Sequence, residues 1–550
     1  MRPHVFPCAL AVAIACVAAG CKSPAPSATA APPLFETFGT LHRDIGSTSP
    51  MAQRYFDQGL RLLYGFNHDA AGRAFAESAR LDPECAICVW GQSVVLGPNI
   101  NMVMDPAAAA EATALARRAA SLSKHAKPAD RALIAALQVR YAVPAPADRK
   151  PLDRAYADAM TQAARDFPDD DDIATLHAES LMDLTPWAYW STDGKTPGAS
   201  TPTILAELER VLARNPQHIG AMHYYIHATE ASATPQRALR YADTLAKLAP
   251  GSGHLVHMPA HTYIRVGRYH DATMINFDAS TADAAFLAVC RGTNGIYPLG
   301  YVPHNWHFAS MTAGLSGSET LALRASDQTA LRADRNRMGT DTSLQAMQLF
   351  VVTPLFTQVR FGRWNDILAQ SSPPGDLPFT SAIWRFARGM AHARTGDTIA
   401  AQADLAALRG ISADPALAKT RFTNGADALV AVAVPFLQGE VLRAQGDLKG
   451  SVAALRLAAT AEDKLLYDEP ANWPLPVRPY LGAALLEAGD ARAAADAYRQ
   501  DLVTYPDNGW SLYGLMLAQK RLNDPAAADT EKRYRDAWQW ADAPLTASRY

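Results

Sequence analysis

The sequence predicts an all-α protein, a right-handed solenoid of helical hairpins with irregular loop insertions. Three observations lead to this prediction. Glycine, alanine and proline recur in register in units of 34 residues. The apolar residues between these markers follow helical spacing, and no stretch has a convincing strand pattern. Hydrophobic residues make up 49% of the 550 residues and charged residues 19%, which provides for a large core and argues against disorder.

Residues 1–20 have the pattern of a signal peptide. A weakly basic start is followed by an apolar run, residues 5–17, which is too short to cross a bilayer comfortably. The run ends in Ala-Ala-Gly before Cys21. This ending resembles a lipobox, in which the cysteine is lipidated and becomes the new N-terminus. A plain signal peptide cleaved near Ala19 is the alternative.

The residues around Cys21 indicate where the mature chain would lie. Lys22 follows the cysteine, which by resemblance to bacterial sorting rules favours the outer membrane. We therefore expect a protein that faces the periplasm and touches the membrane through its lipid alone. Residues 21–33 form a Pro/Ala/Ser-rich tether with nothing to bury.

Two cysteines of the expected mature chain lie close together, in Cys85-Ala-Ile-Cys88. They could form a disulfide, which an exported protein permits, act in redox exchange, or remain semi-buried thiols. Val89 stands where haem attachment would need a histidine. We favour a local structural role for the pair and expect Cys290 to be buried.

The repeat is clearest in residues 475–508. Small residues at the eighth and twentieth places, Gly482 and Ala494, let two antiparallel helices approach closely. Gly489 at the fifteenth place turns the chain, and Pro506 ends the second helix. The same pattern recurs in residues 52–85, 219–252, 253–286, 382–415 and 432–465, and from residue 348 onwards.

We expect three groups of hairpins, in residues 34–184, 185–345 and 346–550. In such arrays the first helix of each hairpin lines a concave face and the second lines the convex face. Longer insertions interrupt the array at residues 185–202, 287–303 and 371–378.

Five short stretches resemble exported bacterial proteins of the tetratricopeptide-repeat (TPR) type. These stretches are Phe66-Asn67-His68, LDPEC at 81–85, HMPAH at 257–261, VRFGRW at 359–364 and NGWSL at 508–512. The resemblance implies a TPR-like helical-hairpin fold and the partner binding common among such scaffolds. It implies no particular activity.

Histidines concentrate in one part of this array. Seven of the fifteen lie within residues 218–270. His223 and His257 are 34 residues apart, as are His227 and His261, so both pairs occupy the same places of consecutive first helices. Residues four apart share one face of a helix, and these places point into the predicted concave groove.

Counting the same places in the neighbouring hairpins brings further side chains to this groove. Glu179 falls at its margin. The predicted groove consists of His223, His227, Glu230, His254, His257, His261, His304 and His307. Imidazole with carboxylate is the ligand set of zinc, copper or non-haem iron. The candidate metal ligands are His223, His227, His257 and His261.

The histidine cluster could be a structural polar network without a function of its own. Otherwise, two functions remain open from the sequence. The groove could bind a protein, a peptide or a small-molecule ligand, with or without a metal. The protein could instead be a metal-dependent hydrolase or oxidoreductase, with Glu230 or Glu179 as general base. A zincin is excluded because Tyr224, not glutamate, follows His223. The net charge of -3 and the lack of a basic face argue against nucleic acid as a partner.

Pro259 lies between His257 and His261, inside an expected first helix. Proline removes a hydrogen bond from a helix interior. Either the helix is distorted at the turn that carries the ligands, or it begins late and Pro259 falls in its first turn.

Overall fold

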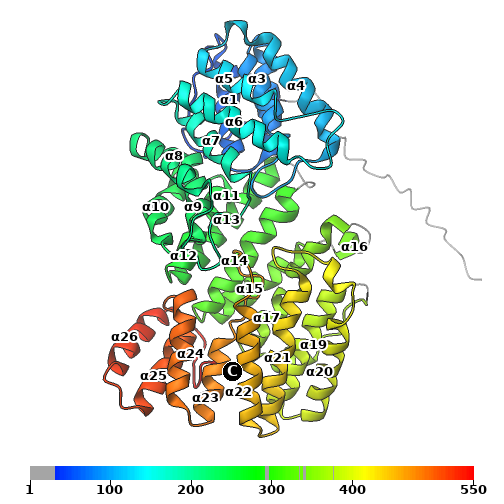
Figure 1. The fold of residues 1–550 in the computed structure, drawn as a ribbon, viewed down its shortest axis with the longest axis vertical. Coiled ribbons are helices and arrows are strands. Elements are labelled where there is room, and N and C mark those ends of the chain that lie inside the picture. Colours follow the sequence, from blue (N-terminus) through cyan, green and yellow to red (C-terminus); the bar gives the residue numbers. More distant parts are fainter. Residues whose placement is uncertain (1–30, 291–295, 334, 339–341, 376) are drawn as a thin grey trace, which may run out of the picture.

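The computed structural model describes residues 31–290, 296–333, 335–338, 342–375 and 377–550. Helices dominate these ranges, and the extended pairings among them are isolated bridges such as Asn99 with Met102 (Figure 1). The predicted all-α solenoid of hairpins is confirmed. The expected signal peptide and Cys21 lie outside the described residues. Within the described ranges, no helix combines the length and apolar character needed to cross a membrane.

The N-terminal hairpins form the top of the molecule in Figure 1. Their helices are α1 (Pro50–Tyr64), α2 (His68–Leu81), α3 (Ala86–Val94), α4 (Ala109–Leu122), α5 (Pro128–Leu137), α6 (Lys150–Asp166), α7 (Asp171–Met182) and α8 (Thr201–Arg214). Short helices and loops join these pairs, and the extended segment before α1 packs along them.

The central hairpins lie in the middle of Figure 1 and carry the histidine-rich region. Their helices are α9 (Ile219–Glu230), α10 (Leu239–Leu248), α11 (Gly253–His257), α12 (Pro259–Arg265), α13 (Tyr269–Cys290), α14 (Val302–Leu315), α15 (Glu319–Leu331) and α16 (Arg335–Met338).

The C-terminal hairpins lie at the bottom of Figure 1. Their helices are α17 (Gln348–Arg360), α18 (Trp364–Leu368), α19 (Pro378–Thr395), α20 (Thr398–Ser412), α21 (Ala426–Ala444), α22 (Leu448–Glu462), α23 (Arg478–Glu487), α24 (Ala491–Thr504), α25 (Gly509–Arg521) and α26 (Ala527–Ala537). Gly489 turns the chain between α23 and α24 with a φ of 86°, a backbone conformation that favours glycine.

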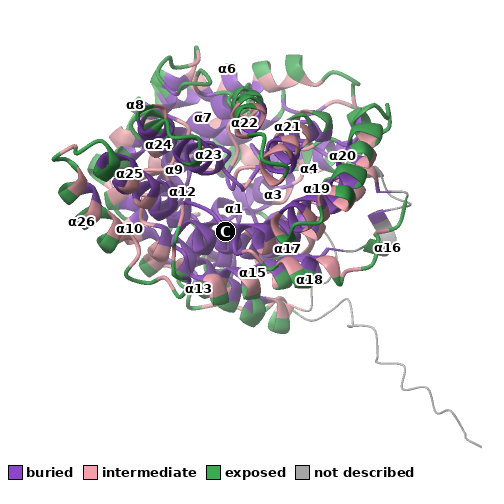
Figure 2. Cartoon of the chain, turned by 90° about the horizontal axis from the view of Figure 1, so that it is seen from below, coloured by how far each residue is buried: buried purple, intermediate pink, exposed green. Residues whose placement is uncertain are grey.

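One apolar core runs from Phe38 to Leu315, and a second fills the hairpins between Val352 and Ala518. Residue 185 therefore marks no break in the core, and the division into three groups of hairpins stays a prediction. The C-terminal repeats also touch the central ones, since the Tyr269 hydroxyl donates to the backbone oxygen of Pro506 at 2.7 Å. Figure 2 shows buried residues throughout the interior and exposed ones at the periphery.

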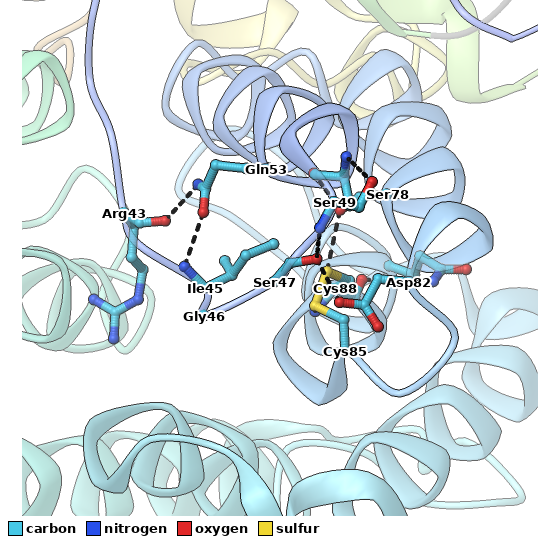
Figure 3. Close-up of a disulfide and its surroundings, with 12 residues drawn as sticks. Arg43, Ile45, Gly46, Ser47, Ser49, Gln53, Ser78, Asp82, Cys85 and Cys88 are labelled. Carbon is cyan, nitrogen blue, oxygen red and sulfur yellow. Dashed lines mark hydrogen bonds between the residues drawn. A yellow bond between two sulfur atoms is a disulfide. The ribbon is translucent and has the colours of Figure 1, made fainter.

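Cys85 and Cys88 form a disulfide at the start of α3, one of the alternatives that the sequence left open (Figure 3). Cys88 is fully buried, with its sulfur 3.1 Å from the Ser78 hydroxyl. Cys290 is only half-buried, contrary to expectation, because it ends the long helix α13 at the surface.

Candidate metal centre

Helices of the central hairpins bring six imidazoles together. Helix α9 carries His223 and His227, α11 carries His254 and His257, α12 carries His261, and α14 carries His304. They form two groups, in each of which one ring nitrogen per histidine lies within 4.8 Å of the others. The first triad is His223, His227 and His254, and the second triad is His257, His261 and His304.

In the second triad, three Nε2 atoms converge. Nε2 of His257 lies 2.8 Å from Nε2 of His261 and 3.1 Å from Nε2 of His304. The other nitrogen of His257 lies 2.6 Å from Oδ1 of Asn276. The amide of Asn276 is oriented by its own Nδ2, which donates to the backbone oxygen of Ala272 at 2.7 Å.

These contacts determine which nitrogen carries the proton. Asn276 offers His257 an oxygen, and Glu230 offers Nδ1 of His261 a carboxylate oxygen at 2.5 Å. Because both oxygens only accept, each neutral ring is protonated on Nδ1 and carries a lone pair on Nε2. Two lone pairs 2.8 Å apart repel each other, so a cation belongs between them: a metal ion or a proton.

The first triad differs in one respect, because Nδ1 of His254 has no hydrogen-bond partner among the described residues. Nδ1 of His223 donates to the backbone oxygen of Tyr64 at 2.7 Å, so its lone pair faces Nε2 of His254 at 3.1 Å. Nδ1 of His227 lies 2.8 Å from Oε1 of Glu230. Nε2 of His227 is buried and has no hydrogen-bond partner among the described residues. Buried polar atoms are rarely left unpaired, so this nitrogen is free to bind an ion.

Glu230 connects the two triads, since one oxygen accepts from His227 and the other from His261. Metal-binding histidines commonly donate their second N–H to such a carboxylate, which orients the ring and raises its basicity. Both oxygens of Glu230 therefore contact imidazole rings, and Glu230 forms with His227 and His261 a third group whose ligand atoms lie within 4.8 Å of one another.

Burial keeps most of these rings neutral. The exposed fractions of five of the six rings are 2% or less. Burial, together with neighbouring imidazoles, lowers the pKa well below its ordinary value for His223, His254, His257 and His304. Burial also opposes charge on His261, but Glu230 outweighs it and raises the pKa of this ring. Against the effect of burial, the neighbouring histidines lower the pKa of Glu230 to about 2.

Aromatic side chains enclose the cluster. The ring of Phe66, from the turn between α1 and α2, lies 4.5 Å from the ring of His223. Trp187, from the insertion at residues 185–202, packs its edge against His227 at 5.1 Å. Residues distant in the sequence thus separate the triads from solvent, which strengthens electrostatic interactions inside.

Pro259 begins helix α12, while the short helix α11 ends at His257. The structure thus combines both alternatives for this proline, because the helix is interrupted at the ligand-bearing turn and Pro259 takes the first place of the new segment. The rings of His257 and His261 still lie together, with 4.7 Å between their centroids.

Two predicted groove residues do not join the cluster. His307 lies three places beyond His304 on α14 and packs against Phe350, with ring centroids 5.6 Å apart. Glu179 belongs to the preceding hairpin and lies near Arg140 and Asp183. Burial, partly offset by Arg140, raises its pKa to about 7. Conversely, the sequence placed His254 and His304 in the groove but not among the metal ligands.

Loops cover part of the predicted histidine-lined groove. Trp187 covers His227, and the hydroxyl of Tyr467 lies 3.5 Å from Oε2 of Glu230. The insertion at 185–202 and the loop after α22 therefore cover part of the concave side. Repeat phase alone gives no information about such loops. As folded, five of the six histidines are buried and His304 is partly exposed.

No protein-family model matches the chain, and no curated protein matches it in sequence. Among solved structures, the chain is similar to the APC/C hetero-tetramer Cut9–Hcn1. The sequence identity is 13%, the TM-score is 0.30, and the match covers 88% of this chain and 73% of that chain. The human IFIT1 dimer with m7Gppp-AAAA shows 11% identity, 91% coverage of both chains and a TM-score of 0.32.

Yeast Tom70 shows 10% identity, 83% and 92% coverage and a TM-score of 0.27. With all three TM-scores below 0.5, the TPR-like fold rests on the hairpins described above.

Proposed function

We propose that this protein is a metalloprotein that binds two transition-metal ions, one in each triad. The contact between His257 and His261 carries the proposal, because their Nε2 atoms lie 2.8 Å apart while Asn276 and Glu230 hold the opposite nitrogens, so a positive charge, which we propose is a metal ion, lies between them. A site with three imidazole ligands leaves a further position for water or substrate, as in catalytic zinc sites.

The ligand set favours copper. Imidazole suits zinc, copper, iron and nickel, whereas magnesium, calcium and manganese prefer oxygen ligands. Six imidazoles and one nearby carboxylate, Glu230, balance little of the charge that two divalent ions would bring into this buried site. Cu(I) brings half that charge. Copper would make the centre suited to an oxidoreductase, and zinc would make it suited to a hydrolase.

Metal analysis of the mature protein, prepared without a histidine tag and supplied with copper or zinc, tests the proposal. We expect about two ions per chain, from two three-ligand sites. A protein with His223→Ala and His257→Ala should lose both ions, whereas His125→Ala, an exposed histidine outside the cluster, should keep them. A chain that stays folded and binds no ion would mean that a proton occupies the space between the rings.

We also propose that the chain is exported and attached to the outer membrane by a lipid on Cys21, facing the periplasm. The signal-like segment supports this address, and the disulfide between Cys85 and Cys88 agrees with an oxidising compartment. Cys21→Ala should leave the protein soluble and without the mass of the lipid. Membrane attachment that survives this substitution would overturn the anchor.

A further inference from the structure

A cavity of about 390 Å³ lies next to the metal centre, lined by α12, α14 and the loop that follows α22. Tyr467 forms the wall nearest the centre. Its hydroxyl donates to Oε1 of Glu469 at 2.8 Å and lies 3.5 Å from Oε2 of Glu230. Glu230 in turn contacts His261, so the cavity is two side chains away from the second triad.

Carboxylates outnumber cations in this cavity. The acidic residues are Asp193, Glu462, Asp463, Asp468, Glu469 and Asp501. The basic residues are Lys195, Arg265 and Arg478. Arg478 is committed to Asp463 through two hydrogen bonds of 2.8 and 2.7 Å, and Lys195 lies 3.9 Å from Asp193. Four carboxylates therefore remain against one guanidinium.

That guanidinium, on Arg265, is itself occupied. It donates to the backbone oxygen of Glu230 at 2.5 Å and lies 5.1 Å from the centre of the Tyr467 ring. Aromatic side chains complete the lining: Tyr467, Trp473 and Tyr505. Carboxylates next to aromatic rings are the surroundings that ammonium groups prefer, since both attract positive charge.

We propose that this cavity binds a small organic cation, with its ammonium group against the carboxylates of the lining, which include Glu469 and Glu462, and its carbon skeleton against the aromatic rings. The cavity falls within the range of small-molecule sites, roughly 300–1,000 Å³. A bare metal ion needs neither this volume nor the apolar lining. The inference rests on the cavity alone and does not require a metal in the triads.

The protonation of the lining agrees with a cationic ligand. Burial raises the pKa of Glu469 to about 8 even though Arg265 lies nearby, and it raises the pKa of Glu462 to about 8. An ammonium group would stabilise the ionised carboxylates, so binding should release protons.

Titration calorimetry with benzylamine tests the site on the full-length mature protein. Benzyl alcohol and benzoate are the neutral and anionic analogues of matched shape. We expect benzylamine to bind at one site, and benzyl alcohol at least about tenfold more weakly, because the charged hydrogen bonds are lost. Proton release is read from the enthalpy measured in buffers of different ionisation heat. Benzylamine that binds no better than benzyl alcohol would overturn the proposal.

Glu469→Gln and Glu462→Gln keep the shape of the cavity and remove its charge. Each should weaken benzylamine binding about tenfold, while Asp158→Asn, an exposed carboxylate on α6, should have no effect. If both variants fold and bind benzylamine with wild-type affinity, the ligand does not bind next to these carboxylates. Metal content, measured on the same samples, separates the two proposals. Binding of benzylamine by a protein without metal contradicts only the metal proposal. Binding of metal without binding of benzylamine contradicts only the proposal of a cation-binding cavity.

Discussion

Oε2 of Glu230 lies 2.5 Å from Nδ1 of His261, while Oε1 of the same carboxylate lies 2.8 Å from Nδ1 of His227. One acidic side chain therefore orients a ring in each triad. The two triads consequently depend on each other, although their remaining rings have different partners: the backbone oxygen of Tyr64 for His223 and the amide of Asn276 for His257.

Replacing Glu230 with glutamine should weaken metal binding in both triads. Glutamine has one accepting oxygen, so its NH₂ group would face an imidazole N–H or force that ring to turn. Loss of such an outer hydrogen bond typically lowers metal affinity about 10–100-fold. Competition with a chromophoric chelator measures the affinity. Glu209→Gln, a carboxylate of helix α8 that contacts neither triad, is the control. Equal affinities for Glu230→Gln and the wild type would show that the carboxylate plays no part in metal binding.

His304 and His307 provide a matched pair on helix α14. Only His304 has a nitrogen facing the second triad, whereas His307 packs against Phe350. His304→Ala should reduce the metal content or the affinity of the second triad, because two imidazoles hold an ion less well than three. His307→Ala should leave both unchanged. Identical metal content in the two variants, at a metal concentration limiting for the wild type, would contradict the proposed ligand set.

The spacing of 34 residues could predict that His223, His227, His257 and His261 converge, since it places equivalent positions of neighbouring helices side by side. It could not predict the separate fates of His304 and His307. Both histidines lie on the continuous helix α14, and which of them faces the triad depends on how that helix packs against its neighbours.

The closure of the site was equally hidden from the sequence. Trp187 and Tyr467 come from irregular loops, and Tyr467 lies 237 residues from its neighbour Glu230. The backbone oxygen of Tyr64, which orients His223, belongs to another hairpin 159 residues away. Contacts of this kind depend on how the hairpins stack, and helical periodicity holds no information about that.

Asp283 should make the stability of the protein depend on pH. Its side chain is fully buried on α13 and accepts from the Tyr297 hydroxyl at 2.7 Å and from Asn305 at 2.8 Å. Burial raises its pKa to about 7, although both hydrogen bonds oppose this. The unfolded pKa is about 3.9, so between these values the folded state keeps a proton that the unfolded state has released.

The free energy of unfolding should therefore fall as the pH rises from about 4 to about 7, by a few kcal/mol at most, and then level off. Asp283→Asn removes the ionisation and should flatten this dependence in thermal unfolding at pH 5 and pH 7.5. The exposed Asp158→Asn should keep the slope of the wild type. If Asp283→Asn keeps the wild-type slope, the pH dependence of the free energy of unfolding arises from other groups.

Gly220 couples the packing of the N-terminal repeats to the metal centre. A Cβ atom at this position would lie 2.4 Å from Cδ1 of Tyr64, the residue whose backbone oxygen orients His223. Alanine in an open helical position is usually stabilising, by about 0.5–1 kcal/mol over glycine. At position 220 the clash outweighs this gain, because overpacking a buried contact costs about 1–3 kcal/mol. Gly220→Ala should therefore lower the melting temperature and also weaken metal binding in the first triad, which depends on the position of Tyr64.

Gly410→Ala is the matched control for this substitution. Gly410 lies in helix α20 with no other atom within 4 Å of its added Cβ, so alanine there should raise the melting temperature slightly and leave metal binding unchanged. Differential scanning calorimetry and the chelator titration, applied to both variants, separate the effects. If Gly220→Ala is destabilised but binds metal with wild-type affinity, Tyr64 packs the interface without orienting His223. If Gly220→Ala is as stable as Gly410→Ala, the added Cβ does not clash with Tyr64. Helices α1 and α9 would then be packed less closely than the 2.4 Å distance from this Cβ to Cδ1 of Tyr64 indicates.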